Sequence, residues 1–174
     1  SHAGIAAVTD DIVYAADIRK VREADPWKRI SALQDALRAC GVPLTMGGRV
    51  EDQHQFNFVT EMQYASNFAK RAALIVAGHA AAWEVAAQLV GGTGCHIQPR
   101  VAPVSWQAMI GAAKGKSRDR KQRAAQALID RYPDFASLGQ GAIDAILIAV
   151  YSHAISNGWE GKASTGIEGW EWIH

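Results

Sequence analysis

The chain opens with two short apolar runs and continues with a helical periodicity. Residues 4–8 and 12–16 are apolar and flank a polar segment at residues 9–11, which predicts two strands joined by a turn. Asp25 and Pro26 then suit the cap and the first turn of a helix. The apolar residues of this helix recur every three or four positions: Trp27, Ile30, Leu33 and Leu37.

Farther along, the apolar runs alternate between strand and helix lengths. The run at residues 56–64 predicts a buried strand that carries Glu61. Residues 67–90, which are rich in alanine, predict a long helix that permits close packing. Weaker patterns predict a strand at residues 96–98 and a short helix at residues 104–110.

Two more helices are predicted in the last third of the chain. Ser117 suits the N-cap of a helix that runs to Asp130. Residues 139–141 (Gly-Gln-Gly) predict a turn, and the apolar run that follows predicts a helix with Asp144 at its start.

Together, these elements predict an α/β fold, and length and composition place few further limits on function. The 174 residues are expected to form one domain at 1–157 and a tail at 158–174, for which no element is predicted. The formal net charge of +1 says nothing about partners, and two cysteines in a chain of this size indicate free thiols in a reducing cytoplasm. The longest apolar stretch, residues 72–90, is interrupted by His79 and Glu84, so no membrane span is expected.

Candidate chemistry comes from acids within the apolar runs and from a block of bases between them. A buried Glu61 or Asp144 would lose several kcal/mol of hydration unless it were paired, protonated or bound to metal. Residues 114–123 hold six basic side chains against one acid. Acids for a divalent metal and bases for a phosphate backbone together indicate phosphodiester chemistry.

Three stretches carry a resemblance to a known family. They are Glu61-Met62-Gln63-Tyr64 before the alanine-rich helix, residues 104–111 with the basic block, and Asp144-Ala145-Ile146-Leu147-Ile148-Ala149. In this order and spacing, residues 1–156 resemble a RuvC-type Holliday-junction resolvase of phages and prophages. The resemblance implies an RNase H-like fold, with a mixed sheet flanked by helices. It also implies a homodimer that cuts four-way or branched DNA by two-metal hydrolysis.

The chain departs from the family pattern in two places. Family members open with a strand that ends in Asp-Pro-Gly, whose aspartate is a metal ligand, and residues 1–5 resemble the sequence just after it. The first strand is therefore expected to be missing from these 174 residues. The family also has an aspartate or histidine one helical turn before its last aspartate, where this chain has Gly141.

The resemblance and the residue chemistry together predict a set of site residues. Glu61 and Asp144 are expected to be catalytic and to bind Mg²⁺, with Mn²⁺ as a possible substitute. The alanine-rich helix is expected to supply the dimer surface. Contacts to DNA phosphates and unpaired bases are expected from Lys114, Lys116, Ser117, Arg118, Arg120, Lys121, Tyr64 and Phe68.

Two other functions remain open at this point. A catalytically impaired RNase H-fold DNA-binding protein would account for Gly141 and for the missing aspartate. A phosphotransferase of the sugar-kinase type would share the fold, but no second domain or phosphate loop is visible. Locally, the basic block could also be a solvated helix face, and Tyr64 and Phe68 could be core residues.

Overall fold

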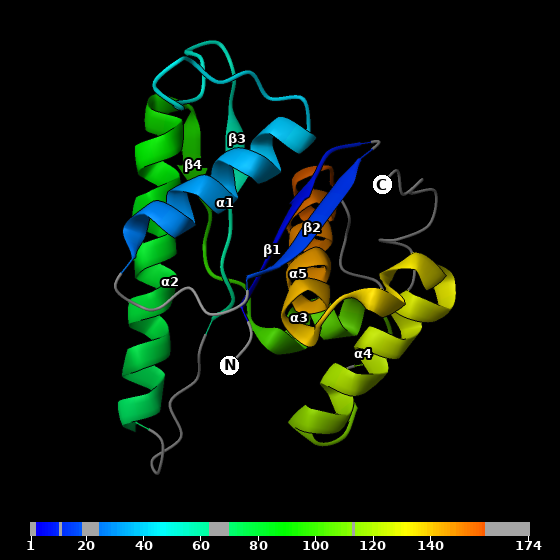
Figure 1. Cartoon of the computed structure of the whole chain (residues 1–174). Coiled ribbons are helices and arrows are strands. Elements are labelled where there is room, and N and C mark those ends of the chain that lie inside the picture. The colour runs from blue at the N-terminus through cyan, green and yellow to red at the C-terminus, as the bar shows by residue number, and fades with distance from the viewer. Residues whose placement is uncertain (1–2, 11, 19–24, 63–69, 113, 159–174) are drawn as a thin grey trace. The chain divides into compact units, whose positions relative to one another are not determined.

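The computed structural model describes residues 3–10, 12–18, 25–62, 70–112 and 114–158 in two compact units. The hairpin unit comprises Ser1–Lys20 and Pro103–His174, and the middle unit comprises Val21–Ala102. In chain order (Figure 1), the elements are β1 (Ala3–Val8), β2 (Val13–Ile18), α1 (Pro26–Ala39), β3 (Phe56–Phe58), α2 (Lys70–Gly91), η1 (Gly92–Gly94), β4 (Cys95–Ile97), α3 (Pro103–Met109), α4 (Ser117–Arg131), η2 (Pro133–Ser137) and α5 (Gln140–Ser156).

In the hairpin unit, β1 and β2 form the predicted antiparallel pair, from Ala3 opposite Ile18 to Val8 opposite Val13. Helix α5 packs along this hairpin, mainly against β1 (Figure 1), and α3 and α4 pack on α5. The fully buried side chains of these three helices include Trp106, Met109, Leu128, Ile146 and Leu147. This core fixes the helix that carries Asp144.

Glycine allows the close approach of β1 to α5. A Cβ at Gly4 would lie 2.2 Å from the backbone of Gly141 and from the amide nitrogen of Ala142.

The prediction of a turn at residues 139–141 was wrong, because α5 already begins at Gln140. Asp144 lies one turn inside the helix and not at its first residue.

In the middle unit, α1 begins as predicted and packs on α2. The Asp25 carboxylate accepts a hydrogen bond of 3.1 Å from the amide of Trp27, and Pro26 occupies the first helical position. Between the two helices, the Arg29 guanidinium lies 6.0 Å from the centroid of the Trp83 ring. Strands β3 and β4 pair in parallel, from Phe56 opposite Cys95 to Phe58 opposite Ile97.

The described residues confirm an α/β fold, but they form two two-stranded sheets and not the single mixed sheet that was predicted. The strand predicted at residues 56–64 is shorter, because regular pairing ends at Phe58. The predicted N-cap of α4 was also wrong by one residue. Lys116 caps the helix without a side-chain hydrogen bond, and Ser117 is the first helical residue.

Helix α2 is more apolar on its surface than the sequence pattern suggested. By length and composition alone, the segment Arg71–Gly94 would be long enough to cross a membrane, with a mean hydropathy of 1.4 in its most apolar window. Only 17% of that window is buried within the structure. The side chains of Leu74, Val85 and Leu89 are 74%, 60% and 53% exposed, and they follow one side of the helix.

Candidate metal and DNA-contact site

Glu61 lies just beyond β3, where backbone hydrogen bonds fix the chain on both sides of it. It forms a single parallel bridge with Val101. The Met62 amide donates to the Val101 carbonyl at 2.7 Å, and the Val101 amide donates to the Thr60 carbonyl at 2.9 Å. The side chain of Glu61 is partly exposed. The backbone at Glu61 is thus held in place although the regular strand has ended.

A cluster that the sequence reasoning missed lies beside Glu61, and it is called the Glu84 clamp here. Arg100 donates to both carboxylate oxygens of Glu84, at 2.8 and 2.9 Å, and the Thr60 hydroxyl donates to one of them at 3.0 Å. The Arg100 guanidinium holds the pKa of Glu84 below its usual value, although partial burial acts in the opposite direction. The clamp ties the residues next to Glu61 and next to Val101 to helix α2.

Asp144 is largely buried, with 15% of its side chain exposed. Both of its carboxylate oxygens accept hydrogen bonds within the hairpin unit. Lys121 of α4 donates to Oδ2 at 2.9 Å, and Gln140, one turn earlier on α5, donates to Oδ1 at 2.7 Å. An anion in this apolar helix is thus neutralised by an ion pair, as its burial requires.

The residues around Lys121 hold its ammonium group close to Asp144. Lys121 lies 5.8 Å from the centroid of the fully buried Trp106 ring, within range for a cation–π interaction. The neighbouring Arg120 donates to the side-chain oxygen of the buried Gln107 at 3.0 Å. Helix α4 is therefore attached to α3 at the turn that carries Lys121.

The loop before α4 is held by two arginines of the helix itself. Arg120 donates to the Gly115 carbonyl at 2.9 Å, and Arg123 donates to the Lys114 carbonyl. Gly115 has a φ of 91°, a conformation that favours glycine. Two of the predicted DNA-contact bases, Arg120 and Lys121, thus make protein contacts in this structure.

The other bases of the predicted block face solvent at the start of α4. Lys114, Lys116 and Arg118 are all exposed, and Ser117 begins the helix between them. The remaining predicted contacts, Tyr64 and Phe68, lie outside the described residues. The exposed bases and Asp144 therefore share one structural unit.

The predicted acids are not part of a larger acidic cluster in the described part of the chain. Glu61 belongs to the middle unit and Asp144 to the hairpin unit. Within residues 3–10, 12–18, 25–62, 70–112 and 114–158, no group of three His, Cys, Asp or Glu side chains could hold a metal ion. Burial raises the pKa of the free Cys95 thiol to about 11, which keeps this thiol protonated at neutral pH.

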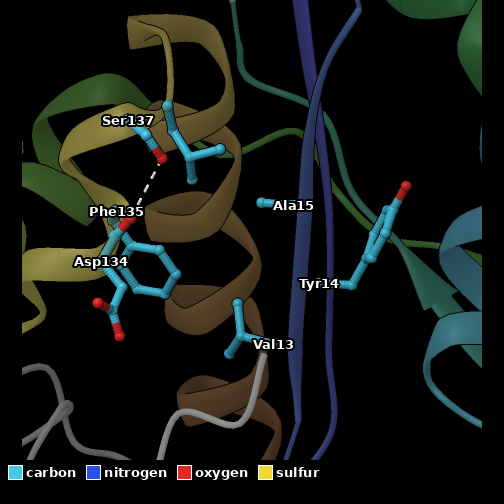
Figure 2. Close-up of a pocket in the computed structure, with 7 residues that line it drawn as sticks. Val13, Tyr14, Ala15, Asp134, Phe135 and Ser137 are labelled. Atoms are coloured by element: carbon cyan, nitrogen blue, oxygen red, sulfur yellow. Dashed lines mark hydrogen bonds between the residues drawn. The ribbon is translucent and has the colours of Figure 1, made fainter.

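A separate pocket between β2 and η2 is lined mainly by apolar residues and by none of the predicted site residues. Its volume is about 230 Å³. Figure 2 shows Val13 and Ala15 pointing from β2 toward Phe135, while Tyr14 points to the other side of the strand. The hydroxyl of Ser137 donates to the Asp134 carbonyl at 3.3 Å (Figure 2). The lining offers packing surface and no arrangement of catalytic groups.

A scan against protein-family models finds no family that matches this chain, and a search of curated proteins finds no match. A function for the chain must therefore be argued from the residues themselves.

Proposed function

We propose that the chain is the core of a RuvC-type, metal-dependent endonuclease that cuts four-way or branched DNA. One observation carries the proposal: a partly buried carboxylate, Asp144, lies against a helix whose first turn and preceding loop expose several bases. A phosphodiester nuclease needs acids for a metal ion beside cations for the DNA backbone. Helix α5 supplies the acid, and α4 with its preceding loop supplies the cations, within the same unit.

Asp144 and Glu61 are the residues that would hold Mg²⁺, and Mn²⁺ could replace it. Both offer hard carboxylate oxygens, which these ions prefer. When bound, the metal would supply positive charge at the attacked phosphate and activate water. The protein's own part is to hold the two acids, Asp144 through Gln140 and Glu61 through the backbone pairing with Val101.

The DNA backbone would be contacted by the exposed bases Lys114, Lys116 and Arg118. They surround the first turn of α4, where free backbone amides also favour an anion. Such contacts position DNA and bring a dependence on salt without reading its sequence.

An RNase H-like fold would require a mixed sheet that includes both strand pairs. The resemblance implies one further strand for this sheet, which would end in Asp-Pro-Gly and precede β1. The exposed apolar residues of α2, which include Leu74, Val85 and Leu89, support a homodimer, because a second copy of the chain could bury them. A cytoplasmic location fits the two free cysteines.

The second candidate is a DNA-binding protein of the same fold with impaired catalysis. The pairing of Asp144 with Lys121 favours it, because the carboxylate is already neutralised. Gly141 also favours it, since glycine supplies no side-chain ligand at the position where the family has an acid or histidine.

Cleavage of a synthetic four-way junction tests the proposal. The assay compares the 174-residue chain with the same chain preceded by a strand that ends in Asp-Pro-Gly, in Mg²⁺ and in EDTA. The shorter chain should bind the junction but cleave it poorly, and the longer one should cleave it in Mg²⁺ only. In the longer chain, Glu61→Gln and Asp144→Asn should each abolish cleavage and leave binding largely intact, because they remove ligand charge and no phosphate contact.

Asp52→Asn is the matched control, since Asp52 is an exposed acid outside both predicted sites. Undiminished cleavage by either active-site variant would remove that residue from the site. Binding without any cleavage by the longer chain would favour the second candidate.

A further inference from the structure

The contact between Lys121 and Asp144 places a cation beside the carboxylate that would bind a metal ion. The ammonium lies 2.9 Å from Oδ2, and the two side chains are 32% and 15% exposed. Gln140 takes the other oxygen at 2.7 Å. Each oxygen keeps a second lone-pair site, but a divalent ion bound there would lie close to the Lys121 ammonium and would be repelled by it.

Of the two partners of Asp144, Lys121 carries the charge that would compete with a metal ion. Its side chain is partly exposed, and a flexible four-carbon stem joins the ammonium to α4. If it left Asp144, it would need another anion. The exposed bases Lys114, Lys116 and Arg118 mark the surface near the start of the same helix as the place where DNA phosphates would arrive.

We propose that Lys121 is an exchangeable counter-cation that couples DNA binding to metal binding at Asp144. In the free protein, Lys121 neutralises Asp144 and weakens metal binding. In the DNA complex, a phosphate takes over Lys121, and the released carboxylate binds the metal ion. The coupling is reciprocal, so metal should also strengthen DNA binding. This inference rests on the proposed function, since it assumes that Asp144 is a metal ligand.

The test measures Mn²⁺ binding by electron paramagnetic resonance, with and without a four-way junction, and requires no cleavage. The variants are Lys121→Met, Lys121→Arg and Asp144→Asn, and Lys28→Met is the control because Lys28 is an exposed lysine of α1. The junction should raise the Mn²⁺ affinity of the wild type about tenfold, within the usual range for coupled sites. Asp144→Asn with the junction gives the amount of Mn²⁺ held by the DNA itself.

Lys121→Met should bind Mn²⁺ about tenfold more tightly than the wild type without DNA, and the junction should add little, as expected for loss of the coupling. Lys121→Arg keeps the charge and should keep the coupling, and thermal melting of each variant verifies that it folds. If Lys121→Met and the wild type bind Mn²⁺ equally while Asp144→Asn has lost it, the counter-cation role is wrong and the metal site stands. If Asp144→Asn binds Mn²⁺ like the wild type, the proposed metal site itself is wrong.

Discussion

Replacing Gly4 with alanine should destabilise the hairpin unit, because β1 and α5 approach each other backbone to backbone there. The new Cβ would lie 2.2 Å from the amide nitrogen of Ala142 and from the carbonyl group of Gly141. Ordinary van der Waals contact begins at 3.4 Å, so the two main chains would have to separate by 3.4 − 2.2 = 1.2 Å. Neither atom group belongs to a side chain that could rotate away.

The separation would loosen the best-packed side of α5. Ala142, Ile143 and Ile146 are 0%, 3% and 0% exposed, and their contacts depend on the present distance between strand and helix. Overpacking of this kind costs about 1–3 kcal/mol. The lower chain entropy of alanine in a strand returns about 0.5–1 kcal/mol of that. We therefore expect a net loss of about 1–2 kcal/mol in the free energy of unfolding, or roughly 2–8 °C in Tm for a chain of this size.

Urea and thermal unfolding followed by circular dichroism measure this loss, with Gly78→Ala as the matched control. Gly78 lies inside α2, and a Cβ there would meet no atom within 4 Å. That variant should gain about 0.5–1 kcal/mol from helix propensity. An equal gain in Gly4→Ala would refute the close packing of β1 on α5.

Two further predictions follow from the charged groups. Replacing Lys114, Lys116 and Arg118 together with alanine should weaken binding to junction and duplex DNA alike. The slope of log affinity against log salt concentration should become less steep by about 0.9 for each lost phosphate contact. An unchanged slope would mean that these bases form only a solvated surface. Glu84→Gln should cost about 1–3 kcal/mol at pH 7, because a partly buried charged hydrogen bond to Arg100 is lost. Because the pKa of Glu84 is lowered, its charge stabilises the fold above the unfolded pKa near 4.5, and this stabilisation disappears as pH falls through the folded pKa. The free energies of unfolding of wild type and variant should therefore converge at low pH. A difference that stays constant with pH would contradict the role of the Glu84 charge.

Elements that depend on local signals could be predicted from the sequence. The Asp25-Pro26 pair fixed the start of α1, and the alternation of apolar and polar segments identified the β1–β2 hairpin. The length of β3 could not be predicted in this way, because a strand continues only as far as its partner does. Pairing with β4 ends at Phe58, although the apolar run continues.

The candidate site was predictable in its residue types but not in its contacts. The apolar run around Asp144 indicated that its charge needed a partner, yet no spacing rule identified Lys121, which is 23 residues away. Glu84 was visible only as an interruption of an apolar helix. Its role as the acceptor for Thr60 and Arg100 arises from segments brought together by the β3–β4 pairing.

The loop before α4 has a consequence for the entropy of ligand binding. The guanidinium groups of Arg120 and Arg123 hold the carbonyls of Gly115 and Lys114. The loop backbone is therefore ordered when the protein folds, before any phosphate arrives. Binding to such a preorganised loop loses little backbone freedom, and only the side chains of the exposed bases remain to be immobilised.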